Sequence, residues 1–155
     1  MRVLHVIPAV ASRYGGPSAA ITPMCRALMD AGLDVRLVST DADGPGRLAV
    51  SLGEDTTWGG VPTLFFPNDA TESFKYSRSM AAWLDAHVRE FDLVHIHAVL
   101  SHAPIAAGAA CRRAGVPYIV RPLGTVASWS LASKPWRKKL LLALGARLRR
   151  SRTSR

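Results

Sequence analysis

Short apolar runs alternate with amphipathic stretches along this chain, and the order predicts strands that alternate with helices. Five runs have the apolar, β-branched character of buried strands, at residues 2–7, 34–40, 62–66, 93–97 and 116–120. Apolar residues recur at helical spacing in three segments, at residues 17–31, 73–91 and 101–114. The pattern therefore predicts an α/β domain with a Rossmann-like, doubly wound parallel sheet. The glycine-rich stretch 41–60 is predicted to be a loop.

The start of the chain allows two interpretations. Arg2 is followed by apolar residues and by Ala9-Val10-Ala11, which resembles the cleavage site of a signal peptide. The apolar run is short and is interrupted by His5 and Pro8, so a first buried strand is the better interpretation. In the helix that follows, Pro23 implies either a later start or a kink.

Length and charge fit one domain with a basic end. The chain has 155 residues, of which 48% are hydrophobic, enough for one core. We expect one domain over residues 1–150 and a disordered basic tail over residues 151–155. Residues 1–133 carry eleven Lys/Arg and eleven Asp/Glu, so the net charge of +9 belongs to the last 22 residues, which hold nine Lys/Arg and no acid. This local charge predicts an anionic partner such as a membrane surface or phosphate, and no nucleic acid.

Cysteine usage and hydropathy predict a location inside the cell. Cys25 and Cys111 lie in apolar, helix-like surroundings without the spacing of a metal or redox motif. No run approaches the ~20 apolar residues that cross a bilayer. We therefore expect a reduced, cytoplasmic protein, with peripheral attachment to the inner face of the membrane as an option.

Two histidines in the fourth predicted strand are the first candidates for chemistry. Alternate residues of a strand point to one face, so His95 and His97 share a face. His97 ends the apolar run and is placed at the carboxyl end of a parallel strand, where open α/β sheets bind ligands. Each histidine is either a hydrogen-bonded structural group or a residue that contacts a ligand. The structural role is favoured for His95, whereas for His97 the two roles are equally supported. His102 lies nearby, but no acidic residue follows Asp92, so neither a metal site nor a cofactor is predicted.

A pair of glycines between the first predicted strand and helix is the second candidate. Gly15 and Gly16 either let the backbone approach an anion at the helix N-terminus or form a plain turn. The dinucleotide fingerprint G-x-G-x-x-G, the P-loop lysine motif and the G-x-S-x-G nucleophile elbow are absent from the sequence. Functions that depend on those motifs are therefore not predicted.

The basic end of the chain contains a last predicted helix, at residues 136–150. Its apolar stripe consists of Trp136, Leu140, Leu141, Leu144 and Leu148, with lysine and arginine at both ends. The segment 134–155 either docks on an anionic membrane surface, with Trp136 as an interfacial anchor, or packs its stripe on the domain. The structural interpretation is favoured.

Seven short motifs follow one another in a fixed order along the chain. They are residues 3–8 (Val-Leu-His-Val-Ile-Pro), 15–17 (Gly-Gly-Pro), 28–35 (Leu-Met-Asp-Ala-Gly-Leu-Asp-Val), 91–97 (Phe-Asp-Leu-Val-His-Ile-His), 114–118 (Ala-Gly-Val-Pro-Tyr), 121–125 (Arg-Pro-Leu-Gly-Thr) and 134–139 (Lys-Pro-Trp-Arg-Lys-Lys). Together they resemble the N-terminal domain of glycosyltransferase family 4, the retaining transferases of the GT-B architecture. The resemblance extends over nearly the whole chain, to about residue 150.

The resemblance implies an acceptor-side domain that faces a donor-binding domain across a cleft. It assigns His97 as a catalytic residue that hydrogen-bonds the donor sugar or the charge of the transition state. It places Gly15 and Gly16 near the donor phosphates and the acceptor, and Arg121 and Gly124 along the cleft. Fixed donors at strand tips suit this reaction, because it develops an oxocarbenium-like sugar and a phosphate leaving group.

The sequence departs from the family pattern in two ways. Ala98 and Leu100 stand where the family often has glycine and, two positions on, an aromatic residue, which leaves the acceptor unspecified. The sequence also lacks the donor-binding domain. We therefore expect a truncated product, a fragment, or a subunit for which a partner chain supplies the C-terminal donor domain, and we expect the chain to be inactive without that domain.

Three hypotheses of function result. The leading one is the acceptor-side half of a retaining glycosyltransferase that moves a hexosyl or related sugar from a nucleotide sugar to a glycan, lipid-linked or small-molecule acceptor, as in polysaccharide biosynthesis. The alternative is a non-catalytic interaction or membrane-docking module that uses the basic C-terminal helix. A third, a stand-alone flavodoxin-like nucleotide-binding protein, is disfavoured because no tight phosphate loop is present.

Overall fold

The computed structural model describes residues 1–123 of the chain. The chain divides into two compact units, Met1–Arg121 and Pro122–Arg155, and the fold below is that of the first unit. The predictions for Gly124, the last helix and the basic tail lie outside the described residues. The single domain over residues 1–150 therefore stays a prediction.

A six-stranded sheet forms the centre of the described unit. Its strands are β1 (Arg2–Ala9), β2 (Asp34–Thr40), β5 (Asp55–Trp58), β6 (Val61–Phe66), β7 (Leu93–His97) and β8 (Tyr118–Arg121). They lie in the order β5-β6-β2-β1-β7-β8, and every neighbouring pair is parallel except β5 with β6. The carboxyl ends of the five parallel strands therefore share one edge, which we call the carboxyl edge. The predicted Rossmann-like, doubly wound α/β fold is confirmed.

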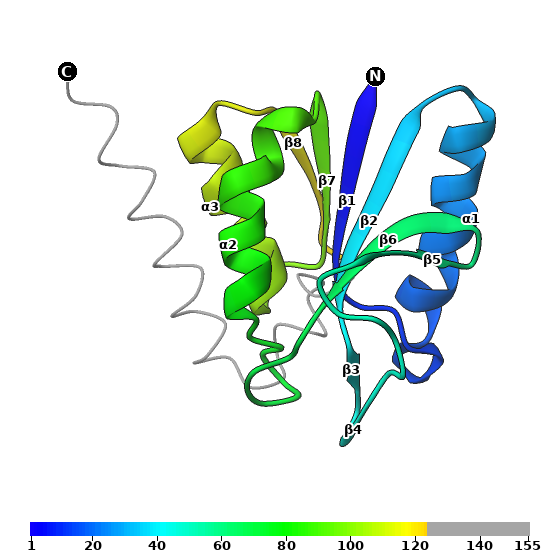
Figure 1. The fold of residues 1–155 in the computed structure, drawn as a ribbon, viewed down its shortest axis with the longest axis vertical. Coiled ribbons are helices and arrows are strands. Elements are labelled where there is room, and N and C mark those ends of the chain that lie inside the picture. The colour runs from blue at the N-terminus through cyan, green and yellow to red at the C-terminus, as the bar shows by residue number, and fades with distance from the viewer. Residues whose placement is uncertain (124–155) are drawn as a thin grey trace. The chain divides into compact units, whose positions relative to one another are not determined.

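Helices cover both faces of the sheet (Figure 1). Helix α1 (Gly16–Asp30) lies on one face, and α2 (Arg78–His87) and α3 (His102–Ala114) lie on the other. Leu4 and Val6 of β1 belong to the core under α2 and α3. His5 lies between them in sequence and therefore points to the α1 face. No helix within residues 1–123 has the length and apolar character needed to cross a bilayer.

Each face of the sheet buries one cysteine. Cys25 of α1 and Cys111 of α3 are both fully buried and unpaired. Burial raises the pKa of the Cys25 thiol to about 12 and that of the Cys111 thiol to about 11. Both cysteines therefore act as small apolar residues of the core.

The prediction of a loop over residues 41–60 is wrong in part. The structure has a short hairpin of β3 (Ala42–Asp43) and β4 (Gly46–Arg47), followed by the edge strand β5. Strand β5 pairs antiparallel with β6, but its burial pattern shows no fully buried residue. An edge strand of this kind lacks the apolar run by which a strand is recognised in a sequence.

The second predicted helix begins later than the sequence pattern suggested. Its predicted range was 73–91, whereas α2 begins at Arg78 and a 3₁₀ turn at Val88–Glu90 ends it. The Ser77 hydroxyl accepts a hydrogen bond from the Met80 N–H at 3.3 Å and caps the helix. Just before this cap, Lys75 has a φ of 51°, which lies in the left-handed region and is incompatible with a continuing helix.

The first helix resolves the question that Pro23 raised. Helix α1 begins at Gly16 and continues through Pro23, so a later start is excluded. It ends at Asp30, and the left-handed Gly32 that follows, with a φ of 84°, donates its N–H to the Met29 carbonyl at 2.9 Å. The remaining predicted boundaries agree with the structure to within about two residues, the usual uncertainty of such boundaries.

Candidate functional site

The candidate site lies at the carboxyl edge, where β1, β7 and β8 are neighbours. His97 is the last residue of β7 and pairs in register with Arg121, the last residue of β8. Gly15 and Gly16 lie in the connection that leaves β1 and begins α1. The structure therefore places all the predicted site residues that it describes at the ends of three adjacent parallel strands.

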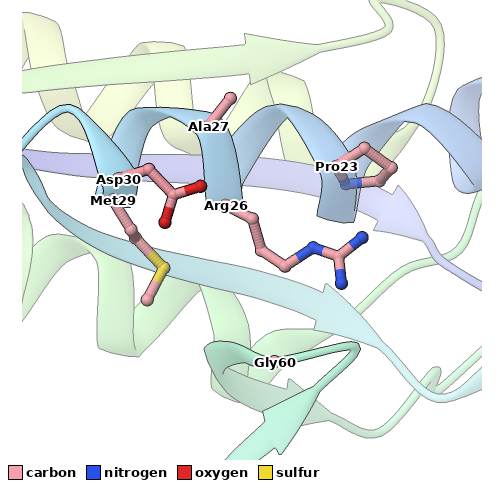
Figure 2. Close-up of a pocket in the computed structure, with 6 residues that line it drawn as sticks. All are labelled: Pro23, Arg26, Ala27, Met29, Asp30 and Gly60. Atoms are coloured by element: carbon pink, nitrogen blue, oxygen red, sulfur yellow. The ribbon is translucent and has the colours of Figure 1, made fainter.

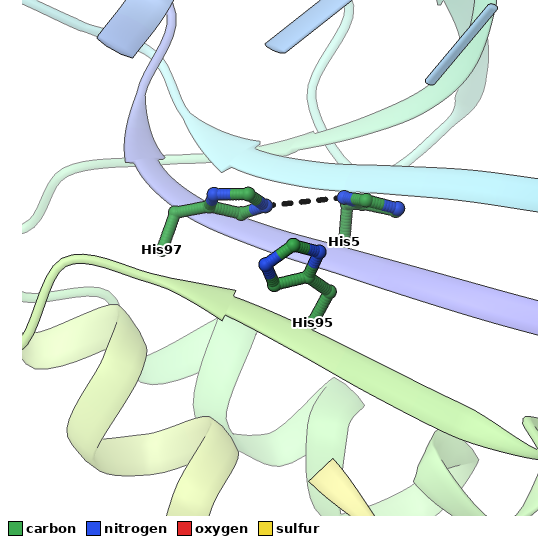
Figure 3. A group of neighbouring side chains, drawn as sticks. All are labelled: His5, His95 and His97. Carbon is green, nitrogen blue, oxygen red and sulfur yellow. Dashed lines mark hydrogen bonds between the residues drawn. The ribbon is translucent and has the colours of Figure 1, made fainter. Parts of the chain in front are cut away.

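A cluster of three histidines occupies the α1 face of β1 and β7. We call His5, His95 and His97 the histidine trio (Figure 3). His5 pairs in register with His95, and its Nδ1 lies 3.1 Å from the Nε2 of His97. One nitrogen of this hydrogen bond donates and the other accepts, and the tautomers decide which. The ring centroids of His95 and His97 are 4.2 Å apart, so the trio is packed ring on ring.

The side chains of the trio are not exposed as the strand pattern of His95 and His97 predicts, with the residue at the strand end more accessible. His97, to which the family resemblance assigns a catalytic contact, is 1% exposed, and His5 is fully buried. His95, for which a structural role was favoured, is only half-buried. The Nε2 of His5 has no hydrogen-bond partner among residues 1–123. Solvent therefore reaches the trio from the side of His95.

The trio is uncharged at neutral pH. Burial, followed by repulsion from His95, lowers the pKa of His5 to about 4 and that of His97 to about 3. Burial and then the charge of Arg121 lower the pKa of His95 as well. Each neutral imidazole offers one N–H donor and one acceptor nitrogen. The cluster can therefore hydrogen-bond, bind a metal ion or relay a proton, but it supplies no charge.

The Gly15-Gly16 turn leaves open space above the backbone. Gly15 has φ 72° and ψ −140°, a conformation that residues with a side chain adopt only under strain. A Cβ atom added at Gly15 or Gly16 would meet no atom within 4 Å. The turn therefore meets both requirements for a backbone that approaches a ligand.

Tyr14 fixes the turn through a network that joins three connections of the carboxyl edge. Its hydroxyl donates to the Glu72 carboxylate and accepts from the Gly44 N–H at 2.8 Å. Lys75 Nζ lies 3.0 Å from Glu72 Oε1 and 4.5 Å from the centroid of the Tyr14 ring. We call Tyr14, Glu72 and Lys75 the tyrosine network.

The pKa values of the tyrosine network reflect its hydrogen bonds. Burial and the bond to Glu72 raise the pKa of Tyr14 to about 12. Burial alone would raise the pKa of Glu72, but hydrogen bonds from Tyr14 and Lys75 outweigh it and lower that pKa. The network is therefore fully formed at neutral pH.

Arg121 and Ala98 complete the tip of β7. The exposed Arg121 guanidinium donates a long hydrogen bond to Met24 Sδ at 3.8 Å and lowers the pKa of both neighbouring histidines of β7. Ala98 has a φ of 70°, and its N–H donates to the Arg121 carbonyl at 2.9 Å. This left-handed position follows His97 directly, and it is one that glycine, the residue the family resemblance implies there, adopts without strain.

Two shallow pockets lie outside the trio. One, of 470 Å³, is lined by Pro23, Arg26, Ala27, Met29, Asp30 and Gly60 (Figure 2). It joins α1 to the turn before β6, so it lies away from the carboxyl edge. The other, of 530 Å³, is lined by Pro67, Asp69, Tyr76, Arg78, Ser79 and Ala82. It lies where β6 ends and α2 begins, and it therefore opens at the carboxyl edge.

His5 was not among the predicted site residues, and neither was any member of the tyrosine network. His5 was considered only as an interruption of an apolar run. A polar residue inside a buried strand is itself a signal, because such a group needs a partner. No comparable signal marks Tyr14 or Glu72, which lie 58 positions apart in irregular connections.

Comparisons with known proteins show which family the chain belongs to. The Glycosyl transferase 4-like domain model matches residues 15–153. A search of curated protein sequences finds no match. Among solved structures, the crystal structure of Anabaena Alr3699/HepE in complex with UDP and glucose resembles this chain with a TM-score of 0.49 and 17% identity. That match covers 77% of this chain but only 29% of the other. Because the family model covers most of the chain, the protein belongs to the glycosyl transferase 4-like domain family.

Proposed function

We propose that this domain forms the acceptor side of a retaining glycosyltransferase site, which moves a sugar from a nucleotide sugar to a glycan, lipid-linked or small-molecule acceptor. Family membership supports a role in glycosyl transfer. The observation that carries the proposal is the convergence of the Gly15-Gly16 turn, His97 and Arg121 at the ends of β1, β7 and β8. Ligands of open α/β sheets bind at this edge.

Each residue has a role that fits its surroundings. The open backbone of Gly15 and Gly16 at the start of α1 receives the donor phosphates, helped by the helix dipole. Arg121 adds the positive charge that a departing diphosphate needs. The Nε2 of His97 is bonded to His5, so its Nδ1 is the atom left for the sugar. The pocket of 530 Å³ supplies space for the acceptor beside Tyr76.

A nucleotide-sugar titration followed by NMR tests the proposal. ¹⁵N-labelled chain is titrated with UDP-glucose and, separately, with GDP-mannose. We expect amide shifts at Gly15, Gly16 and Arg121, with weak affinity because a GT-B site holds the donor between two domains. Arg121→Ala weakens the shifts, and the matched control Arg26→Ala, in the pocket of Figure 2, leaves them unchanged.

Two outcomes of this titration contradict the proposal. Shifts confined to the surroundings of Arg26 and Gly60 place the ligand away from the carboxyl edge. Micromolar affinity of the chain alone for a nucleotide sugar contradicts a donor site that needs a second domain. Replacing His97 and His95 by asparagine in turn identifies which of the two histidines senses the donor.

The charge at the end of the chain supports a second candidate, docking on an anionic membrane. The last 22 residues hold nine Lys/Arg and no acid. Flotation of the chain with phosphatidylglycerol-containing liposomes, with and without residues 134–155, tests it. Binding that disappears with the segment supports docking, and unchanged flotation excludes it.

A further inference from the structure

His5 is a buried polar residue to which the proposed transfer reaction gives no role. It lies inside β1, is fully buried, and faces two other imidazoles. We propose that His5, His95 and His97 bind one divalent transition-metal ion, Zn²⁺ by preference, in an open three-histidine site. This site goes beyond the proposed function, because glycosyl transfer as described above uses no metal ion.

The backbone brings the three ligands together. His5 and His95 are register partners on adjacent parallel strands, and His97 follows two positions later on the same face. One ring nitrogen from each histidine lies within 4.8 Å of the other two. The backbone of two hydrogen-bonded strands is rigid, so the positions of the three histidines do not depend on a mobile loop.

The spacing of the nitrogens suits zinc. Two nitrogens at Zn–N distances of about 2.0–2.1 Å on a tetrahedral ion lie about 3.3 Å apart. The His5 Nδ1 to His97 Nε2 distance is already 3.1 Å, so this pair needs little change in separation, but both rings must turn to aim their lone pairs at the ion instead of along the N···N line. His95 is half-buried, and its side chain therefore has the freedom to close the remaining distance.

The chemistry of the cluster also fits a metal ion. Zinc binds the neutral imidazole, and His5 and His97 offer ring nitrogens from almost fully buried side chains. The ion displaces the hydrogen bond between His5 and His97, and the ring that donated it moves its proton to its other nitrogen. No net proton is released. The solvent side at His95 lets the ion enter and leaves a fourth position for water, as in open zinc sites.

Arg121 provides an independent check on the location of the ion. Its positive charge acts on His95 and His97 and must oppose a cation bound there in the same way. Removing that charge should therefore strengthen metal binding. A merely structural cluster of imidazoles predicts no such gain.

Competing metal ligands are few in this chain. It contains five histidines, and residues 124–155 contain no histidine, cysteine, aspartate or glutamate. His102 is engaged at Nδ1 by the Ser77 N–H. The main competitor is the exposed pair of His87 and Glu90, whose Nδ1 and Oε1 are 2.6 Å apart. His87→Ala is therefore the matched control.

A cobalt titration of the full chain tests the site. Chelator-treated chain is titrated with Co²⁺, whose visible bands are strong in tetrahedral and weak in octahedral coordination, and Zn²⁺ is then added to displace it. We expect one ion per chain and strong bands. His95→Ala weakens binding by more than about tenfold, since even losing an outer partner costs about 10–100-fold. Arg121→Met tightens binding by about threefold at low ionic strength, and His87→Ala has no effect.

The variant His95→Ala is chosen because the half-buried ring tolerates removal better than buried His5. Circular dichroism confirms that each variant is folded before it is titrated. The proposal is overturned if the wild-type chain takes up no ion, if His95→Ala binds as tightly as the wild type, or if His87→Ala abolishes uptake. The assay contains no nucleotide sugar, so its result is independent of the proposed glycosyl transfer.

Discussion

The histidine trio and the tyrosine network lie at the same edge of the same sheet, yet their polar groups are satisfied in opposite ways. The trio is built on strands, is held in the interior, and has one internal hydrogen bond. The tyrosine network is built on connections and combines a phenol, a carboxylate and an ammonium group that bond to one another.

The difference indicates which cluster serves stability and which serves function. Buried polar groups without partners cost free energy, so they persist where chemistry requires them. The tyrosine network instead ties the Gly15-Gly16 turn to the hairpin at Gly44 and to the connection before α2. We therefore expect changes at the trio to alter the unfolding free energy through the cost of burying its rings. Changes at the tyrosine network should make the loops around it more mobile.

Acidification should have the largest effect, and it should act on the trio. The unfolded histidines bind protons with a pKa near 6.5, but folded His5 and His97 do so only near 4 and 3. Between these values the unfolded state holds more protons, so stability is fully present above pH 6.5 and is lost as the pH falls. Each ring alone costs about 2 kcal/mol at pH 5 relative to pH 7. Because the rings interact, the two losses do not add fully.

Urea unfolding at pH 7 and pH 5 measures this loss. The tyrosine network should not contribute, because the pKa of Tyr14 lies near 12 and that of Glu72 lies below its usual value. His5→Asn should flatten the pH dependence. A wild-type stability that is the same at both pH values would show that the trio is not buried in its neutral form.

Substitution of Gly15, in the turn that the tyrosine network holds in place, should have the next largest effect. Gly15→Ala forces a side chain into φ 72°, ψ −140° and should cost about 1–3 kcal/mol of unfolding free energy. Gly16→Ala, with a helical backbone and open space, should stay within about 0.5 kcal/mol. Chemical denaturation of both variants measures the difference, and equal losses would refute the special role of Gly15.

Removal of the Tyr14 hydroxyl should have a smaller effect. Tyr14→Phe leaves the Gly44 N–H without its partner and the Glu72 carboxylate with Lys75 alone, and it should cost about 1–2 kcal/mol. Tyr118→Phe is the matched control, because Tyr118 is an exposed residue of β8. Hydrogen exchange should rise at Gly44 and Gly15 in Tyr14→Phe only. If both variants lose equal stability, the network does not fix the turn.

The smallest effect is expected at Ala98, beside the trio. Ala98→Gly relieves a left-handed residue but makes the unfolded chain more flexible, so we expect a net gain of about 0.5 kcal/mol. Ala107→Gly, in the buried face of α3, should instead lose about 1 kcal/mol. Thermal unfolding distinguishes the two, and a loss at Ala98 equal to that at Ala107 would contradict the strain.

The strands of the sheet could be predicted because each is marked by its own local sequence. Continuous apolar runs located the parallel strands β1, β2, β6, β7 and β8 to within about two residues. The run in β8 was predicted to be buried, but all four residues of this strand are exposed. Strand β5 could not be located in this way, because an edge strand with polar residues has no such run. Its position depends on pairing with β6, which is a tertiary property.

The site could be predicted only where its residues are close to one another in the sequence. The two histidines of β7 are two residues apart, so their common face follows from the strand period. Their contact with His5 joins residues 92 positions apart and requires β1 to lie beside β7 in the sheet. The greater exposure of His95 than of His97 likewise depends on packing, so the residue facing solvent could not be chosen from the sequence.

The two buried thiols make the protein convenient for site-specific labelling. Cys25 and Cys111 are fully buried, and their raised pKa values leave almost no thiolate at neutral pH. A maleimide dye should therefore react with neither cysteine in the folded chain. Ser79→Cys would place one reactive thiol in the pocket of 530 Å³, where a fluorophore can report occupancy without removal of either native cysteine.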